Sequence, residues 1–197
     1  MAALPMFPLG SVLFPYTPLP LRVFEPRYLT MIGHLLDEED PQFGVVLIER
    51  GQEVGGGDLR SGIGTMARLT SVSADADVLH IVAVGTTRFS IDEWVDDAPH
   101  PRAAVTPLPE LTWDDALTPL RTLAESTVRR VLARADSPWS ADTDLSDDPL
   151  ASSWQLAEIA PLGDYDRYTL LRSTSLGALL RQVIDLTLEA ESLWTTG

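Results

Sequence analysis

The sequence contains no cysteine and no lysine, and each absence excludes several kinds of chemistry. All 14 strongly basic residues among the 197 are arginines. Without cysteine the sequence cannot form a disulfide, a thiol nucleophile or a cysteine zinc site. Without lysine it cannot form a P-loop phosphate site, a Schiff base or a serine–lysine dyad. The sequence therefore supplies neither an ATPase site of the P-loop type nor a serine–lysine peptidase site.

The sequence also lacks a basic region. Its net charge is −15, with 15 acids and 7 arginines in residues 1–111 and 14 acids and 7 arginines in residues 112–197. Because neither half is basic, we expect no nucleic-acid partner and no attraction to an anionic membrane. No basic residue precedes Arg22, prolines interrupt the apolar N-terminus, and no apolar run approaches the ~20 residues of a membrane span. We expect a cytoplasmic protein without a signal peptide.

Catalytic motifs are absent as well. The three histidines, His34, His80 and His100, lie in no HxxxH or HExxH pattern, and no GxSxG elbow is present. Adjacent aspartates are explained by helix capping or solvation, since neighbours in sequence point apart. We therefore predict no catalytic residue, no cofactor and no enzymatic activity.

Two loops resemble ligand sites only superficially. The segment "GQEVGGGD" at 51–58 is rich in glycine, but no lysine follows, so a flexible connection is predicted. The segment "DTDLSDD" at 142–148 resembles a calcium loop, but the glycine and glutamate positions hold Asp147 and Ser153. We predict a solvated acidic loop there and no bound metal.

The first 111 residues have the pattern of short strands. Strands are predicted at 4–7, 18–24, 43–49, 63–73, 78–91 and 103–108, with a turn at 75–77. Prolines frame the first two, which we interpret as edge or rim strands. Gly85 predicts a bulge or bend, and Pro26 begins a helix that ends before the acidic run at 37–40. About six strands of this kind bury their apolar faces most economically in a small barrel.

The pattern becomes helical at residue 112. An apolar stripe predicts a helix capped by Thr112 that ends near Arg134. Three further helices are predicted to begin at Ser152 or Ser153, at Asp164, and at Thr174 or Ser175. The fold class is therefore α+β, with a β-barrel at 1–111 and a helical bundle at 112–197.

Three segments carry a family resemblance. "LPMFPLGSVLFPYTPLPLRVFEPRYLTMI" at 4–32 resembles the start of the Lon N-terminal domain, also called the Lon substrate-binding domain. "IGTMARLTSV" and "VAVGTTRFSI" are similar to its middle hairpin, and "LAEIAPLGDYDRYTLLRSTSLGALLRQVIDL" is similar to its helical part. The resemblance implies a PUA-like pseudo-barrel followed by a helical bundle. It also implies a substrate-recognition role without the ATPase and peptidase domains of full Lon proteases, as in a stand-alone Lon N-domain protein.

The resemblance leaves three hypotheses of function open. The first is a non-catalytic module that binds unfolded or peptide-like protein clients. The second is an adaptor or regulator that docks on a partner protein such as a full protease. The third is an unrecognised small-molecule enzyme that uses carboxylates of the barrel. The sequence does not specify an oligomeric state.

Two groups of residues are candidates for these roles. We predict a client-binding surface of apolar residues at the barrel rim and its junction with the bundle, surrounded by acids that favour basic segments; the alternative is that these residues are core. Its members are Leu13, Phe14, Tyr16, Trp94 and Trp113. We also predict a structural ion-pair network in which a partly buried Glu25 is paired with a cation of the hairpin. Its members are Glu25, Arg27, Arg68 and Arg88.

Overall fold

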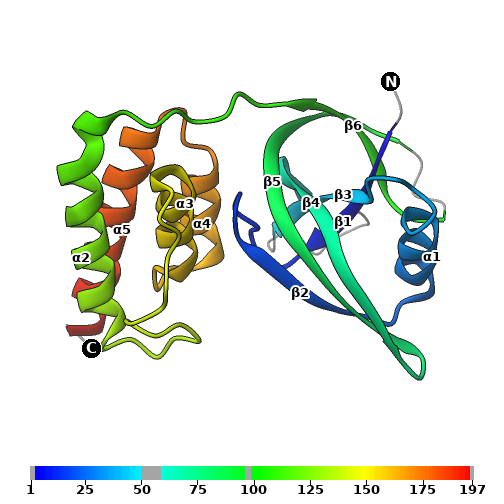
Figure 1. Ribbon diagram of the computed structural model, residues 1–197, viewed down its shortest axis with the longest axis horizontal. Helices are drawn as coiled ribbons and strands as arrows, with labels where there is room; N and C mark the ends of the chain where they lie inside the picture. The colour runs from blue at the N-terminus through cyan, green and yellow to red at the C-terminus, as the bar shows by residue number, and fades with distance from the viewer. Residues whose placement is uncertain (1–2, 50–58, 96–98, 196–197) are drawn as a thin grey trace. The chain divides into compact units, whose positions relative to one another are not determined.

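The computed structural model describes residues 3–49, 59–95 and 99–195, so the glycine-rich segment at 51–58 lies outside the described residues. The chain forms two compact units, which we call the barrel unit, residues 1–110, and the helical unit, residues 111–197. Each unit is described by itself below (Figure 1).

The barrel unit is a ring of strands with one helix. Its elements are β1 (Leu4–Leu9), β2 (Pro18–Val23), α1 (Pro26–Leu35), β3 (Gln42–Glu49), β4 (Leu59–Asp75), β5 (Val78–Trp94) and β6 (Arg102–Pro107). The sheet order is β2-β5-β4-β3-β1-β6, and an additional pairing of β5 with β6 closes the ring. The long strands β4 and β5 curve strongly around it (Figure 1). The predicted fold class, six strands and early helix are confirmed.

The first two strands differ in whether they lie at an edge of the sheet. Among the described strands, β2 pairs with β5 alone and is the edge strand that the sequence predicts. Its two prolines, Pro18 and Pro20, are two residues apart, so both remove N–H donors from one side of the strand, which protects a free edge. β1 is not an edge: it pairs in parallel with β3 and antiparallel with β6. The prediction that β1 is an edge strand was wrong, because a proline removes an N–H donor from only one side of a strand and the other side can still pair.

Strand residues alternate between two separate cores. Phe7 and Val45 pack in a cluster with the buried face of α1, whereas their neighbours Met6 and Val46 pack with Phe89. Successive side chains of a strand point to opposite faces, so one strand contributes to both clusters. The face of α1 that joins the first cluster has helical spacing: Tyr28, Met31, Ile32 and Leu35.

The connection between β1 and β2 is buried against the barrel strands. The Thr65 hydroxyl donates to the Leu13 carbonyl over 2.6 Å, and the Tyr16 N–H donates to the Gly85 carbonyl over 2.8 Å. A Cβ atom at Gly85 would lie 2.1 Å from the Phe14 carbonyl oxygen, so only glycine fits there. Tyr16 has a φ of 62°, a conformation that costs a non-glycine residue about 1–3 kcal/mol. We call residues 10–17 the docked loop.

The middle hairpin follows the prediction. Asp75 pairs with Val78, so Ala76 and Asp77 form the turn. The register between β4 and β5 shifts between Gly85 and Arg88, which confirms the bulge predicted near Gly85.

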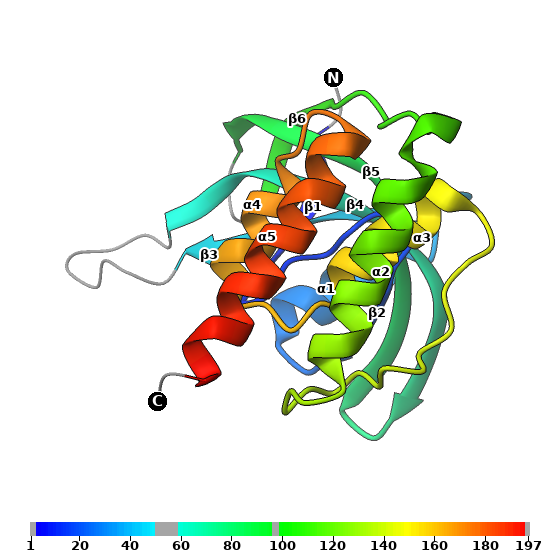
Figure 2. The same cartoon turned by 90° about the vertical axis from the view of Figure 1, so that its left-hand side faces the viewer.

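The helical unit contains one short 3-10 turn and four α-helices. They are η1 (Asp115–Leu117), α2 (Thr118–Leu132), α3 (Pro149–Ile159), α4 (Asp164–Leu171) and α5 (Leu176–Thr195). Figure 2 shows α2 and α5 side by side, and both lie next to α3. The predicted helical bundle is therefore present.

Three of the predicted caps are wrong by a few residues. Asp114, rather than Thr112, caps the first turn by accepting from the Ala116 N–H, and Asp148 caps α3. The N-cap of α4 is Gly163 rather than Asp164. Several residues with capping side chains precede each helix, and sequence spacing alone does not choose among them. The cap of α5 is confirmed, since the Ser175 hydroxyl accepts from the Ala178 N–H.

One ion pair is largely buried in the helical unit. Arg167 of α4 donates to the Glu158 carboxylate over 2.5 Å and to its carbonyl over 2.8 Å. Burial raises the pKa of Glu158, and the charge of Arg167 acts in the opposite direction. The pair therefore joins α3 to α4. Loss of Arg167 would leave the largely buried Glu158 charge without a partner, which is energetically costly.

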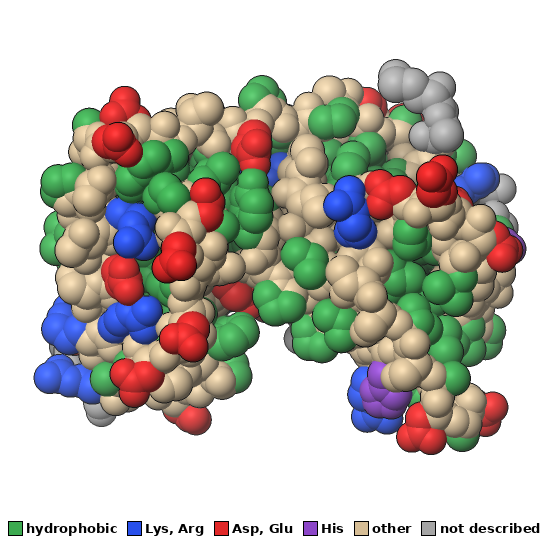
Figure 3. Space-filling view, in the orientation of Figure 1, with side chains coloured by type: hydrophobic (Ala, Val, Ile, Leu, Met, Phe, Trp, Pro, Cys, Tyr) green, Lys and Arg blue, Asp and Glu red, His purple; other side chains and the backbone are tan. Residues whose placement is uncertain are grey.

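Charged side chains of both signs are interspersed over the helical unit on the face shown in Figure 3.

Within the described ranges, no helix is long and apolar enough to cross a membrane. The same residues contain no group of three or more acidic or histidine side chains that could hold a metal ion.

Candidate functional site

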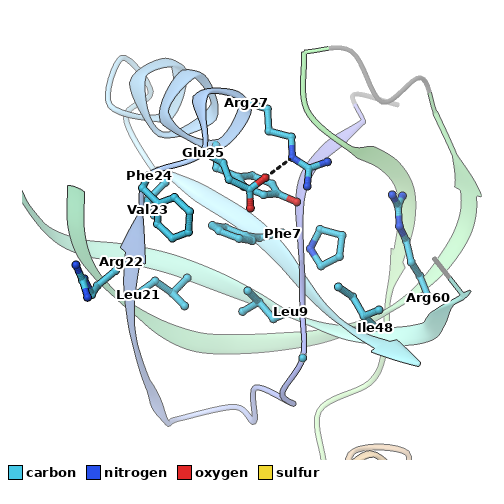
Figure 4. A pocket seen from close by; sticks show the side chains of 13 residues that line it. Phe7, Leu9, Leu21, Arg22, Val23, Phe24, Glu25, Arg27, Ile48 and Arg60 are labelled. Carbon is cyan, nitrogen blue, oxygen red and sulfur yellow. Dashed lines mark hydrogen bonds and ion pairs between the residues drawn. The ribbon is translucent and has the colours of Figure 1, made fainter. Parts of the chain in front are cut away.

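A pocket of about 290 Å³ opens on the barrel unit between β1, β2 and the start of α1. Its walls are formed by residues of β1 and β2, which precede and follow the docked loop in sequence, and by residues of β3 and β4 (Figure 4). The lining residues are Phe7, Pro8, Leu9, Gly10, Leu21, Arg22, Val23, Phe24, Glu25, Arg27, Tyr28, Ile48 and Arg60. Most side chains among these described residues are apolar, and the charged ones are three arginines and one glutamate.

The apolar floor is an uncovered part of the core beneath α1. Phe7 and Val23 belong to that core cluster, while Leu9 and Leu21 pack against it and stay partly exposed. Alternation along β1 and β2 turns these side chains toward the same core. Figure 4 shows Leu9 and Leu21 pointing toward each other across the pocket. The pocket exists because this core cluster extends beyond the part that α1 covers.

The start of α1 forms the second wall. Pro26 occupies the first helical position, and Glu25 is the N-cap residue without a capping bond from its side chain. Its carboxylate accepts instead from Arg27 Nε over 3.1 Å. The Tyr28 ring stacks on Phe7 with ring centroids 4.0 Å apart, and the Arg27 guanidinium lies 4.6 Å from the Tyr28 ring.

Phe24 is the most exposed apolar residue of the pocket. It follows the buried Val23 and lies on the opposite side of the chain, with 65% of its surface accessible. An exposed phenylalanine beside an apolar pocket is typical of a contact surface. The sequence prediction did not single it out, although the alternation from Val23 would have placed Phe24 on the outer face.

The third wall carries Arg60. Ile48 of β3 and Arg60 of β4 are opposite each other in the ladder, so the register fixes both at this side. The Arg60 guanidinium lies 4.3 Å from the Trp94 ring, a cation–π contact. Trp94, which the sequence suggested as a contact residue, is half-buried, contacts Arg60 and is not itself among the described lining residues.

Two other candidates are not on the surface. Leu13 and Phe14 are 4% and 0% exposed, so the expectation that they are exposed at the barrel rim is wrong. The docked loop turns them inward, because its carbonyls find hydrogen-bond donors on β4 and β5 and Gly85 leaves room for the backbone. Tyr16 is half-buried, and its hydroxyl donates to the Glu110 carboxylate.

Trp113 belongs to the helical unit. Its indole N–H donates to the Asp115 carboxylate over 2.9 Å, and the side chain is half-buried. A local role in fixing the entry to η1 accounts for this contact.

The predicted ion-pair network does not form as expected. Glu25 is exposed and pairs with Arg27, while Arg68 pairs with Asp40 over 2.9 Å. Arg88 lies buried in β5, donates to the Pro109 carbonyl over 3.2 Å, and has a pKa lowered by burial. The prediction was wrong because it placed Glu25 between two buried elements, whereas the strand-to-helix corner faces outward at that residue.

Comparison with known proteins gives a consistent assignment. Residues 3–189 match the sequence model of the ATP-dependent protease La (LON) substrate-binding domain. The chain therefore belongs to this family, as its N-terminal motifs suggest. A search of curated protein sequences gives no match.

Two solved structures share the fold over almost their full length. The crystal structure of a Lon N-terminal domain protein from Xanthomonas campestris is 25% identical with a TM-score of 0.66, covering 94% of this chain and 98% of that chain. The N-terminal domain of the Mycobacterium avium complex Lon protease is 18% identical with a TM-score of 0.69, covering 95% of this chain and 99% of that chain. The second likeness shows the fold alone.

Proposed function

We propose that this protein binds unfolded or peptide-like segments of other proteins in the pocket of the barrel unit and does no chemistry on them. The observation that carries the proposal is an apolar floor, continuous with the core, beside an exposed Phe24. A volume of about 290 Å³ is at the lower end of small-molecule sites and suits one or two side chains of a peptide. Membership of a substrate-binding family supports the same role.

The chemistry of the lining supports binding without catalysis. Among the described residues that form the pocket, the carboxylate is Glu25, half-exposed and paired with Arg27. The described lining residues include no serine, threonine or histidine, so they do not assemble a nucleophile with a neighbouring base.

The test is binding of a permanently unfolded, carboxymethylated protein, measured by fluorescence anisotropy. Phe24→Ser should weaken binding about tenfold or more, because burial of a phenylalanine side chain contributes about 1.5–3 kcal/mol. The matched control is Leu123→Ser on α2, which changes a residue of similar exposure, 53%, in the helical unit and should leave affinity unchanged.

Equal affinities for the Phe24 variant and the parent protein would contradict the proposal. Mass spectrometry of the unfolded protein after incubation should show an unchanged mass, and cleavage or modification dependent on pocket residues would contradict the absence of catalysis. Circular dichroism of both variants verifies that the fold is retained.

A further inference from the structure

Two of the three histidines lie side by side in the barrel unit, although they are far apart in the sequence. His34 belongs to the last turn of α1, and His100 lies in the connection from β5 to β6. Their ring centroids are 6.3 Å apart, and the ring planes are inclined by 58°. No spacing motif indicates this pair, because only the fold of the barrel unit brings the two segments together.

His100 is held in one position. It is 5% exposed, and Pro99 and Pro101 on either side restrict its backbone. Its Nδ1 lies 3.2 Å from the Pro101 carbonyl oxygen. Because a carbonyl oxygen only accepts, Nδ1 carries the hydrogen in the neutral ring, and Nε2 keeps the lone pair that binds a metal. A backbone carbonyl orients many metal-binding histidines in this way.

His34 is the adaptable member of the pair. It is exposed on α1, so its ring can turn about the side-chain torsions. A metal bonded to one nitrogen of each ring at about 2.0–2.1 Å holds these nitrogens roughly 3–4 Å apart, depending on the angle at the metal. The centroids lie beyond the bonded nitrogens, so 6.3 Å is at the wide end of what a bridging metal spans. A small rotation of His34 shortens this distance.

The surroundings favour a cation at this position. α1 ends beside His34, where the Asp37 N–H donates to the His34 carbonyl, and the C-terminal end of a helix attracts positive charge. Residues 37–40 are all acidic, and the net charge of −15 raises the concentration of cations near the surface. These features add to the affinity that the two imidazoles supply.

We propose that His34 and His100 bind one divalent transition-metal ion, of the class of Zn²⁺, Cu²⁺ and Ni²⁺, with water completing its coordination. Imidazole nitrogens select these metals over Mg²⁺ and Ca²⁺, which prefer oxygen ligands. The ion ties the end of α1 to the connection between β5 and β6 and thereby stabilises the barrel unit. The proposal is independent of peptide binding, and it assigns a metal to a chain for which the sequence predicted none.

The first test is calorimetric titration of the full chain with Zn²⁺, followed by thermal unfolding. We expect one high-affinity ion per chain, and Zn²⁺ at about 100 times its Kd should raise Tm by about 5–10 °C. Mg²⁺ at the same concentrations should give neither signal. Equal responses to Zn²⁺ and Mg²⁺ would show that acidic side chains bind the ion and would overturn the proposal, as would the absence of Zn²⁺ binding.

Two histidine variants locate the ion. His34→Gln should weaken Zn²⁺ binding about tenfold or more, because it removes a ligand. The matched control is His80→Gln, which changes an exposed histidine of β5 and should leave the affinity unchanged. Circular dichroism verifies that both variants keep the fold. Equal affinities of His34→Gln and the parent protein would overturn the proposal.

The role of His100 is read in the parent protein, because substitution of a buried residue is expected to disturb the fold. Nuclear magnetic resonance of the imidazole nitrogens, recorded with and without Zn²⁺, separates the three rings. Zn²⁺ should shift the ring signals of His34 and His100 and leave those of His80 in place. Unchanged His100 signals, or equal shifts in all three rings, would overturn the assignment of the pair.

Discussion

The barrel unit and the helical unit differ in what holds their segments together. In the barrel, a backbone segment is pressed against other backbone: a Cβ atom at Gly85 would meet the Phe14 carbonyl, and one at Gly64 would meet the Val45 carbonyl at 2.3 Å. In the helical unit, a Cβ atom at Gly177 would meet only the ends of side chains, the nearest at 3.3 Å, and one at Gly163 would meet nothing within 4 Å. The barrel unit should therefore tolerate small changes of volume less well.

The first prediction adds one methyl group at the tightest of these places. Gly85→Ala should destabilise the barrel unit by about 3 kcal/mol or more, because the docked loop must move away from β5. Urea unfolding, with amide hydrogen exchange to identify the unit that opens, measures the effect.

The control for that substitution lies on the partner strand. Gly62→Ala in β4 places its methyl group where no atom lies within 4 Å, and it should change stability by less than about 1 kcal/mol. Similar losses at Gly62 and Gly85 would show that strand glycines in general, and not the docked loop, cause the effect.

The second prediction concerns the buried charge of the helical unit. Arg167→Met should cost about 2–4 kcal/mol at pH 7, because it leaves an ionised Glu158 partly buried without its partner. Burial raises the pKa of Glu158 above its unfolded value, so its contribution to stability is present at low pH and is lost as the pH rises through the folded pKa. Because the pKa of Glu158 is raised, more of the carboxyl is protonated at pH 4 than at pH 7, and the same substitution should cost clearly less at pH 4.

Urea unfolding at the two pH values measures this difference. Arg130→Met removes the partner of Glu191 from an exposed pair of α2 and α5 and should have little effect at either pH. A cost of Arg167→Met that does not change between pH 4 and pH 7 would show that lost packing, rather than charge, accounts for it.

The third prediction compares the same type of substitution, threonine to valine, in both units and expects opposite changes in stability. Thr65→Val should cost about 1–2 kcal/mol, because the Leu13 carbonyl of the docked loop loses its donor. Thr187 in α5 is equally buried, but among the described residues its hydroxyl has no hydrogen-bond partner. Thr187→Val should therefore stabilise the protein by up to about 1 kcal/mol. Thermal unfolding of both variants measures the pair, and a loss in both would contradict the stated difference between the units.

Local patterns in the sequence predicted most of the elements. The helical spacing after Pro26 and the turn before Val78 depend on neighbouring residues, so α1 and the middle hairpin were found. Three of the four predicted caps in the helical unit were missed by a few residues, because several capping side chains compete before each helix.

The docked loop and the pocket could not be predicted in the same way. Proline and glycine around residues 8–18 indicate a connection, and connections are normally exposed. The burial of Phe14 depends on Gly85 and Thr65, which are more than 50 residues away. The pocket likewise joins Leu9 to Arg60 through strand register, which no local pattern contains.

The ring closure has a consequence for how the chain folds. Leu4 of β1 pairs with Ala103 of β6, so the ring stays open until segments about 100 residues apart meet. Contacts at such separation slow folding, whereas helices form from neighbours. At about 5–20 residues per second on the ribosome, β1 waits roughly 5–20 seconds for its second partner, β6. During that interval the ring is open, and under the proposed function the nascent chain would itself be a ligand of finished copies of the protein.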